Sequence, residues 1–270
     1  MHCGADRFGE CIGEVSYSGM EMMNVGHREG GETLYLLDDL EVVHHNIEGM
    51  SREDTEGLLK ECRLSVETVE ELEFAISRAT QKTSDGLLKL PLNEPIKETL
   101  WLSFHRKIFG KAFRWGGEYR RRDDIVVGRK EFVTAPSVEL PTRMSEFEVL
   151  AQQSQTWLLK NASPEDPQYW RMLAELYFKF CEIHPFRDGN GRVSRLILSI
   201  LLFQTLPEPV PLNWGLLRRR TRKTDRAFEQ ARLNEDLWPI AKLLYRVYCA
   251  SVEGLNKKPP KCTFDGCRKV

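Results

Sequence analysis

The chain has 270 residues, of which 41% are hydrophobic, 29% charged and 10% aromatic. This composition is typical of a globular protein and argues against a disordered chain, a collagen-like repeat or a coiled-coil rod. The 39 basic residues nearly balance the 40 acidic ones, which leaves a formal net charge of -1. The overall charge therefore does not favour nucleic acid as a partner, and any function that depends on charge must be local.

No run of apolar residues has the length that a membrane helix needs, and the first ten residues lack the apolar core of a secretory signal. We therefore expect a cytoplasmic protein with no membrane partner. The seven cysteines are widely spaced and odd in number, which favours free thiols over a disulfide framework. Cys262 and Cys267 lie close together, but no second pair of ligands accompanies them, so an uncommitted tail is favoured over a zinc site.

Apolar residues at helical spacing predict a mainly α-helical chain after a loosely ordered leader at residues 1–31. The first helix carries an apolar stripe over residues 36–47 and is expected to close at Gly49. Further helices are predicted at residues 53–63, 66–80, 95–109, 140–159, 169–183, 193–206, 225–233 and 237–252. Two short β-prone runs at residues 125–127 and 132–134 predict a small β-hairpin among these helices.

The segment HPFRDGNGRVSR at residues 184–195 lies between two predicted helices and has the composition of an anion site. Gly189 and Gly191 permit a tight turn whose N–H groups lead into a helix that starts near Arg192, and a helix N-terminus favours negative charge. Arg192 and Arg195 are three residues apart and present guanidinium groups to one side of that helix, which suits phosphate oxygens.

Two further residues of this segment add chemistry to the predicted phosphate site. Asp188 offers the hard oxygen ligands that suit a magnesium ion bridging phosphates. His184 offers a group that can remove a hydroxyl proton near neutral pH. The segment therefore predicts a site for a phosphate-bearing substrate.

Residues 184–195 resemble the signature of Fic-domain proteins, HxFx(D/E)GNGRxxR, at every fixed position. The resemblance implies a helical bundle with a small β-hairpin flap over the active site. It implies transfer of AMP from ATP to a Ser, Thr or Tyr hydroxyl of a target protein, with release of pyrophosphate. It divides the chain into the leader, N-terminal helices at 32–64, a Fic catalytic core at 65–252 and a polar tail at 253–270.

The same resemblance implies the role of each residue of the segment. His184 is the general base, and Asp188 binds Mg²⁺. Residues 189–191 form an anion hole from main-chain N–H groups and the Asn190 side-chain amide. Arg192 and Arg195 hold the β- and γ-phosphates, and Arg187, at a variable position, assists with phosphates or product.

Two other segments also resemble parts of Fic proteins. FRWGGEYR at residues 113–120 resembles the element that precedes the flap, and residues 128–136 resemble the flap itself. The flap would bind the main chain of the target peptide by strand addition. The flap residues that the resemblance assigns to target docking are Gly128, Phe132, Val133 and Thr134.

The segment HHNIEG at residues 44–49 resembles the inhibitory motif (S/T)xxxE(G/N) of Fic proteins that carry an N-terminal autoinhibitory helix. Glu48 and Gly49 match, whereas His44 stands where Ser or Thr is expected. The resemblance implies that Glu48 pairs with Arg195 and so blocks productive binding of the γ-phosphate. In some relatives the same glutamate orients a water molecule that removes AMP.

The leading hypothesis is thus a Mg²⁺- and ATP-dependent protein adenylyltransferase that is autoinhibited through Glu48. One alternative is an enzyme that removes AMP through Glu48 or transfers another nucleotide moiety. The other is a nucleotide-binding or protein-interaction module without turnover, which the intact motif argues against. A homodimer is implied by the resemblance alone. The basic runs at 120–122 and 218–223 are interpreted as solvated faces rather than a nucleic-acid site.

Overall fold

The computed structural model describes residues 52–121, 134–206, 210, 212–215 and 221–264, all within the unit that runs from Tyr35 to Val270. The predicted helix that carries Glu48 lies outside the described residues. So does most of the predicted flap, including Gly128, Phe132 and Val133.

The described part of the chain is mainly helical and contains no strand, which confirms the predicted fold class apart from the hairpin. The α-helices are α1 (Arg52–Glu61), α2 (Val69–Asp85), α3 (Glu98–Phe109), α4 (Leu140–Lys160), α5 (Pro167–Ile183), α6 (Asn190–Thr205), α8 (Thr221–Asn234) and α9 (Trp238–Gly254). Two 3-10 turns, η2 (Gly86–Lys89) and η3 (Ser137–Glu139), precede α3 and α4. The helices predicted within these ranges are present, with ends that shift by at most five residues.

Polar caps explain where two of these helices begin. The Thr68 hydroxyl accepts the N–H of Glu71 at 3.2 Å and the Glu71 carboxylate accepts the N–H of Thr68 at 3.2 Å, a capping box that starts α2 three residues later than its apolar pattern predicted. The Asp166 carboxylate accepts the N–H of Gln168 at 2.9 Å, and Pro167 occupies the first position of α5.

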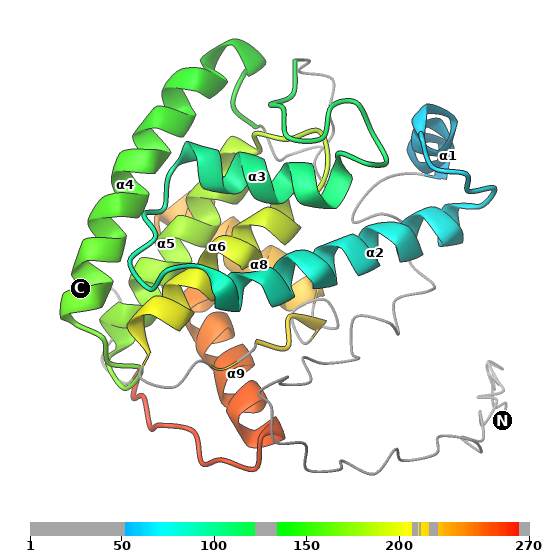
Figure 1. Ribbon diagram of the computed structural model, residues 1–270. Helices are drawn as coiled ribbons and strands as arrows, with labels where there is room; N and C mark the ends of the chain where they lie inside the picture. The colour runs from blue at the N-terminus through cyan, green and yellow to red at the C-terminus, as the bar shows by residue number, and fades with distance from the viewer. Residues whose placement is uncertain (1–51, 122–133, 207–209, 211, 216–220, 265–270) are drawn as a thin grey trace, which may run out of the picture. The chain divides into compact units, whose positions relative to one another are not determined.

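Helix α6 is buried on almost all sides and contains the second half of the candidate segment at residues 184–195. It contacts α3, α4 and α5, and α5 in turn packs against α4 and α9 (Figure 1). Seven of its apolar residues are at most 4% exposed: Val193, Leu196, Ile197, Leu198, Ile200, Leu201 and Leu202. A helix that is apolar all round belongs in a core. The N-terminus of α6 is therefore anchored by the core.

Residues 260–264, expected to be part of an uncommitted polar tail, pack against α9. The Tyr245 hydroxyl donates to the Pro260 carbonyl at 2.6 Å and accepts the N–H of Cys262 at 3.0 Å. The Phe264 ring lies 5.5 Å from the ring of Tyr245 and 6.4 Å from that of Trp238. The ring of Phe264 packs on α9 and so holds this part of the tail against the helix. The sequence did not indicate this contact, because Phe264 is surrounded by polar residues.

Two expectations from the sequence, one on membrane helices and one on cysteines, can be compared with the described residues. The helices seen in the described ranges are too short or too polar to cross a membrane. No disulfide joins Cys62, Cys181, Cys249 or Cys262, the cysteines that the structure describes, which agrees with the expectation of thiols rather than a disulfide framework.

Candidate active site

The candidate site is the turn that joins α5 to α6. His184 ends α5 in the left-handed region, with φ 52° and ψ 60°, and its N–H donates to the Phe180 carbonyl at 3.1 Å. Pro185 follows and has no N–H with which to continue the helix. The imidazole of His184 is therefore held where the chain leaves α5.

At the other end of this turn, α6 begins at Asn190, earlier than the start near Arg192 that the sequence predicted. Gly191 consequently lies in the first helical turn, and Gly189 is the glycine of the segment with a left-handed backbone, at φ 79°. A Cβ atom at Gly189 would come within 2.2 Å of Cε2 of Phe109. Only glycine satisfies both the backbone angle and the close approach.

We expect Gly189→Ala to lower the free energy of unfolding by about 2–4 kcal/mol, for two reasons. The new methyl group must displace the buried ring of Phe109, and alanine is strained at a positive φ. Gly57→Ala is the matched control, since a Cβ at Gly57 on α1 meets nothing within 4 Å. Alanine favours a helix over glycine by up to about 1 kcal/mol, so the control should be neutral or stabilising. Urea unfolding of both variants measures the difference, and equal effects would contradict the close approach.

The imidazole of His184 is neutral at pH 7. Burial lowers the pKa of His184 to about 4, a hydrogen bond to the main chain of Cys181 raises it, and the positive charge of Arg120 lowers it. A neutral ring has a lone pair that can accept a proton, which is the first requirement for a general base.

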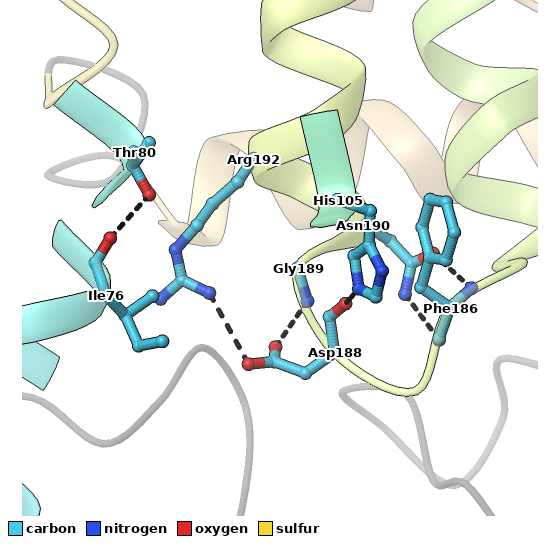
Figure 2. Close-up of polar contacts among 8 residues, drawn as sticks. All are labelled: Ile76, Thr80, His105, Phe186, Asp188, Gly189, Asn190 and Arg192. Atoms are coloured by element: carbon cyan, nitrogen blue, oxygen red, sulfur yellow. Dashed lines mark hydrogen bonds and ion pairs between the residues drawn. The ribbon is translucent and has the colours of Figure 1, made fainter. Parts of the chain in front are cut away.

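Asp188 and Arg192 meet at the N-terminus of α6 (Figure 2). The Asp188 Oδ1 accepts the N–H of Gly189 at 2.6 Å, and Oδ2 lies 3.5 Å from Nη1 of Arg192. Both side chains are about one-tenth exposed, at 9% and 11%. Charges screened this little by water interact strongly. The first turn of α6 thus already holds one anionic group, the Asp188 carboxylate, between a main-chain N–H and a guanidinium.

Asp188 also fits the Mg²⁺ that the resemblance implies. Among the residues that the structure describes, no group of three or more His, Cys, Asp or Glu side chains forms a metal cage. Mg²⁺ is commonly bound by one or two carboxylates together with substrate phosphates and water. A single carboxylate beside an anion site therefore suits an ion that arrives with a nucleotide.

The Asn190 side chain does not point into an anion hole as expected. Its Oδ1 accepts the N–H of Phe186 at 2.8 Å, and its Nδ2 donates to the carbonyl of the same residue at 2.8 Å (Figure 2). Asn190 is 3% exposed, so this amide braces the turn from within. An anion at this helix start would therefore meet main-chain N–H groups, which helices leave without intrahelical partners in their first turn.

Arg187 forms an ion pair with α1, and its expected role with phosphates or product stays a prediction. Its two terminal nitrogens donate to the Glu61 carboxylate of α1, Nη1 at 2.6 Å and Nη2 at 2.9 Å. The guanidinium also lies 5.7 Å from the ring centre of Trp115. Arg195 lies on α6, half-buried, and its expected partner Glu48 falls outside the described residues. The pairing of Glu48 with Arg195 stays a prediction.

Arg120 contacts the candidate site, although the sequence assigned it no role there. Expected on a solvated basic face, it is only 5% exposed. Its Nε donates to the His184 carbonyl at 2.7 Å, and its Nη2 contacts the Ile183 carbonyl at 3.4 Å. The same Nη2 donates to Thr134 Oγ1 at 3.4 Å and to the Ala135 carbonyl. Arg120 therefore joins the end of α5 to Thr134, the one assigned flap residue that the structure describes.

His105 on α3 is a second residue that the sequence did not single out. It is fully buried beside the turn, and its Nε2 lies 3.1 Å from the Asp188 carbonyl (Figure 2). Burial lowers the pKa of His105 to about 3, the hydrogen bond to the main chain of Asp188 raises it, and the charge of Arg192 lowers it. Nothing in its sequence neighbourhood distinguishes it from a core histidine.

Known proteins match the part of the chain that contains this site. Residues 95–202 match the Fic/DOC family. Over 111 residues, the chain is 33% identical to a protein adenylyltransferase Fic of Drosophila melanogaster and 34% identical to that of Drosophila willistoni. These alignments cover 40% of this chain and 20% of each relative. The chain thus spans about a fifth of the length of the curated relatives it matches.

Solved structures share the helical fold at lower identity. The BepC protein of Bartonella tribocorum, with bound AMPPNP, aligns with a TM-score of 0.57 and 17% identity over 69% of this chain and 90% of its own. Fic-1 of C. elegans aligns with a TM-score of 0.54 and 20% identity over 77% of this chain and 58% of its own. The motif at residues 184–195 lies inside the region that matches, so the chain carries at residues 95–202 a region similar to the Fic/DOC family.

Proposed function

We propose that the chain is a protein adenylyltransferase, which transfers AMP from ATP to a hydroxyl side chain of a target protein. One observation carries this proposal: His184 lies at one end of a short turn, and at its other end the Gly189 N–H and Arg192 face the Asp188 carboxylate at the N-terminus of α6. The adenylyltransferase names of the Drosophila relatives and the nucleotide analogue in the BepC structure support it.

In this reaction the imidazole of His184 takes the proton of the target hydroxyl. The hydroxyl oxygen then forms a bond to the α-phosphorus of ATP, the bond from that phosphorus to the bridging oxygen breaks, and pyrophosphate leaves. Phosphate groups beside the turn raise the pKa of His184 toward neutrality, because negative charge favours the imidazolium form. A base tuned in this way is more effective than one with a pKa near 4.

The N-terminus of α6 receives the phosphates. Main-chain N–H groups of its first turn donate to the oxygens on which charge develops, and Arg192 contributes a guanidinium once it leaves Asp188. Mg²⁺, held by Asp188 when bound, would neutralise part of the phosphate charge. Arg195 would hold the γ-phosphate, and residues 128–136 would bind the main chain of the target.

Autoinhibition through Glu48 is part of the proposal and gives a direct test. Glu48→Gly should raise the incorporation of label from α-³²P-ATP by roughly tenfold or more, since it frees Arg195 for one charge-assisted contact with the γ-phosphate. The measurement is Mg²⁺-dependent labelling of the purified chain and of proteins in a lysate, with γ-³²P-ATP and EDTA as negative controls.

Glu41→Gly is the matched control, because it places the same glycine in the same predicted helix away from the motif. Its labelling should equal that of the wild type. If no variant labels protein, yet AMP-modified protein loses its AMP only when Glu48 is present, the chain is a hydrolase and the proposal is wrong. ATP binding without transfer or removal of AMP in any variant would instead indicate a module without turnover.

A further inference from the structure

His105 makes contacts on every side in the core behind the proposed anion site. Its ring stacks on that of Phe186, with centroids 3.8 Å apart and planes at 6°, and lies 4.9 Å from the ring of Phe109. Its Nδ1 lies 2.8 Å from the N–H nitrogen of Gly117, and its Nε2 lies 3.1 Å from the carbonyl oxygen of Asp188. The ring thereby links α3, the turn at residues 115–117 and the turn that joins α5 to α6.

These two partners determine which ring nitrogen carries the hydrogen. The main-chain N–H of Gly117 is a donor, so Nδ1 must accept. The Asp188 carbonyl is an acceptor, so Nε2 must donate. A doubly protonated ring would set two donors against each other at Gly117. The contacts therefore assign the neutral ring with its hydrogen on Nε2.

The bond to Asp188 also sets the direction of the next N–H. The carbonyl of residue 188 and the N–H of Gly189 belong to one planar trans peptide and point in opposite directions. Because His105 holds the carbonyl against α3, the N–H of Gly189 must point out of the core. In the structure that N–H donates to a carboxylate oxygen of Asp188 at 2.6 Å, so it already faces an anionic oxygen.

We propose that His105 is a positioning residue, which directs the Gly189 N–H at a phosphate oxygen of the nucleotide by holding the opposite side of the same peptide plane. This inference rests on the proposed function, because it needs a phosphate at the N-terminus of α6. It assigns His105 no contact with substrate and no proton transfer.

Two substitutions separate this role from general packing. In His105→Gln the side-chain amide nitrogen reaches the position of Nε2 and can still donate to the Asp188 carbonyl. In His105→Asn the shorter amide reaches the position of Nδ1 and can accept from Gly117, but the donor to Asp188 is lost. Both variants lose the stack on Phe186, so their thermal midpoints should fall by similar amounts.

The dissociation constant for AMPPNP with Mg²⁺, measured by calorimetry on the full chain, should distinguish the two variants. His105→Gln should bind within about threefold of the wild type, and His105→Asn about tenfold or more weakly, the effect of one misdirected hydrogen bond to a charged group. Equal affinities in the two folded variants would overturn the proposal.

The tautomer is read independently from the ¹⁵N spectrum of the wild-type imidazoles, with the signal of His105 assigned in the wild type by its contact with the main-chain N–H of Gly117. A neutral ring with hydrogen on Nε2 supports the proposal, and hydrogen on Nδ1 or on both nitrogens overturns it even if neither variant folds. A chain that binds AMPPNP but labels no protein, even as the Glu48→Gly variant, would refute the transferase function and leave the comparison of His105→Gln with His105→Asn intact. A wild type that binds no AMPPNP would overturn both.

Discussion

Replacing His184 by alanine should lower the rate of AMP transfer by about 10²–10⁴, the usual contribution of a general base. The affinity for AMPPNP should stay within about twofold of the wild type, because the groups proposed to bind phosphate begin at Gly189, on the other side of the turn. Single-turnover labelling with α-³²P-ATP in the Glu48→Gly background gives the rate, and calorimetry gives the affinity. His27→Ala, in the leader, is the control histidine substitution.

The pH dependence of the same reaction follows from the pKa of His184. The base acts only when neutral, so the rate should hold constant where the ring is neutral and decline as the pH falls toward the folded-state pKa of about 4. Bound phosphate shifts this decline to higher pH. If the His184→Ala variant keeps more than a tenth of the wild-type rate, another group accepts the proton. The same conclusion would follow if the rate of the wild type rises as the pH falls.

Arg120→Met should lower the free energy of unfolding by about 3 kcal/mol or more, because it leaves the carbonyls of Ile183, His184 and Ala135 without a charged donor in a buried place. For a domain of this size the thermal midpoint would fall by roughly 6–12 °C. Transfer of AMP should fall further than the folded fraction does, since the carbonyl that fixes His184 has lost its partner.

Arg121→Met is the matched control for this prediction. Arg121 is the next residue in the chain, its side chain is 85% exposed, and its contact is a surface ion pair with Glu118 at 2.8 Å. Such pairs contribute about 0–1 kcal/mol, so stability and transfer should hardly change. Calorimetric melts of both variants make the comparison, and an equal loss in the two would show that burial of Arg120 is not what matters.

The helices could be predicted from the sequence because apolar residues repeat at a spacing of three and four, as Val69, Leu72, Ile76 and Ala79 do in α2. The start of α6 was misplaced because its N-cap is Gly189, which has a left-handed backbone and no side chain that could cap the helix. The observed start of α2 is later than the predicted one, because a capping box at Thr68 fixes where the helix begins although the apolar pattern begins earlier.

The candidate site was predictable where its residues are neighbours along one turn, as His184, Asp188 and Arg192 are. The supporting contacts were not, because they join residues 64 positions apart for Arg120 and His184, 83 for His105 and Asp188, and 126 for Arg187 and Glu61. A periodic pattern within a short window holds no information about such pairs. The sequence likewise could not show that the Asn190 amide forms hydrogen bonds with the main chain of Phe186 inside the turn.

The contacts of Tyr245 with residues 260–264 place the end of the folded domain beyond the last helix. A recombinant fragment trimmed at Gly254, where α9 ends, would lose both hydrogen bonds of the Tyr245 hydroxyl and uncover the aromatic faces of Tyr245 and Trp238. Exposed aromatic patches of this kind promote self-association. The C-terminal boundary of a well-behaved fragment therefore lies past Phe264.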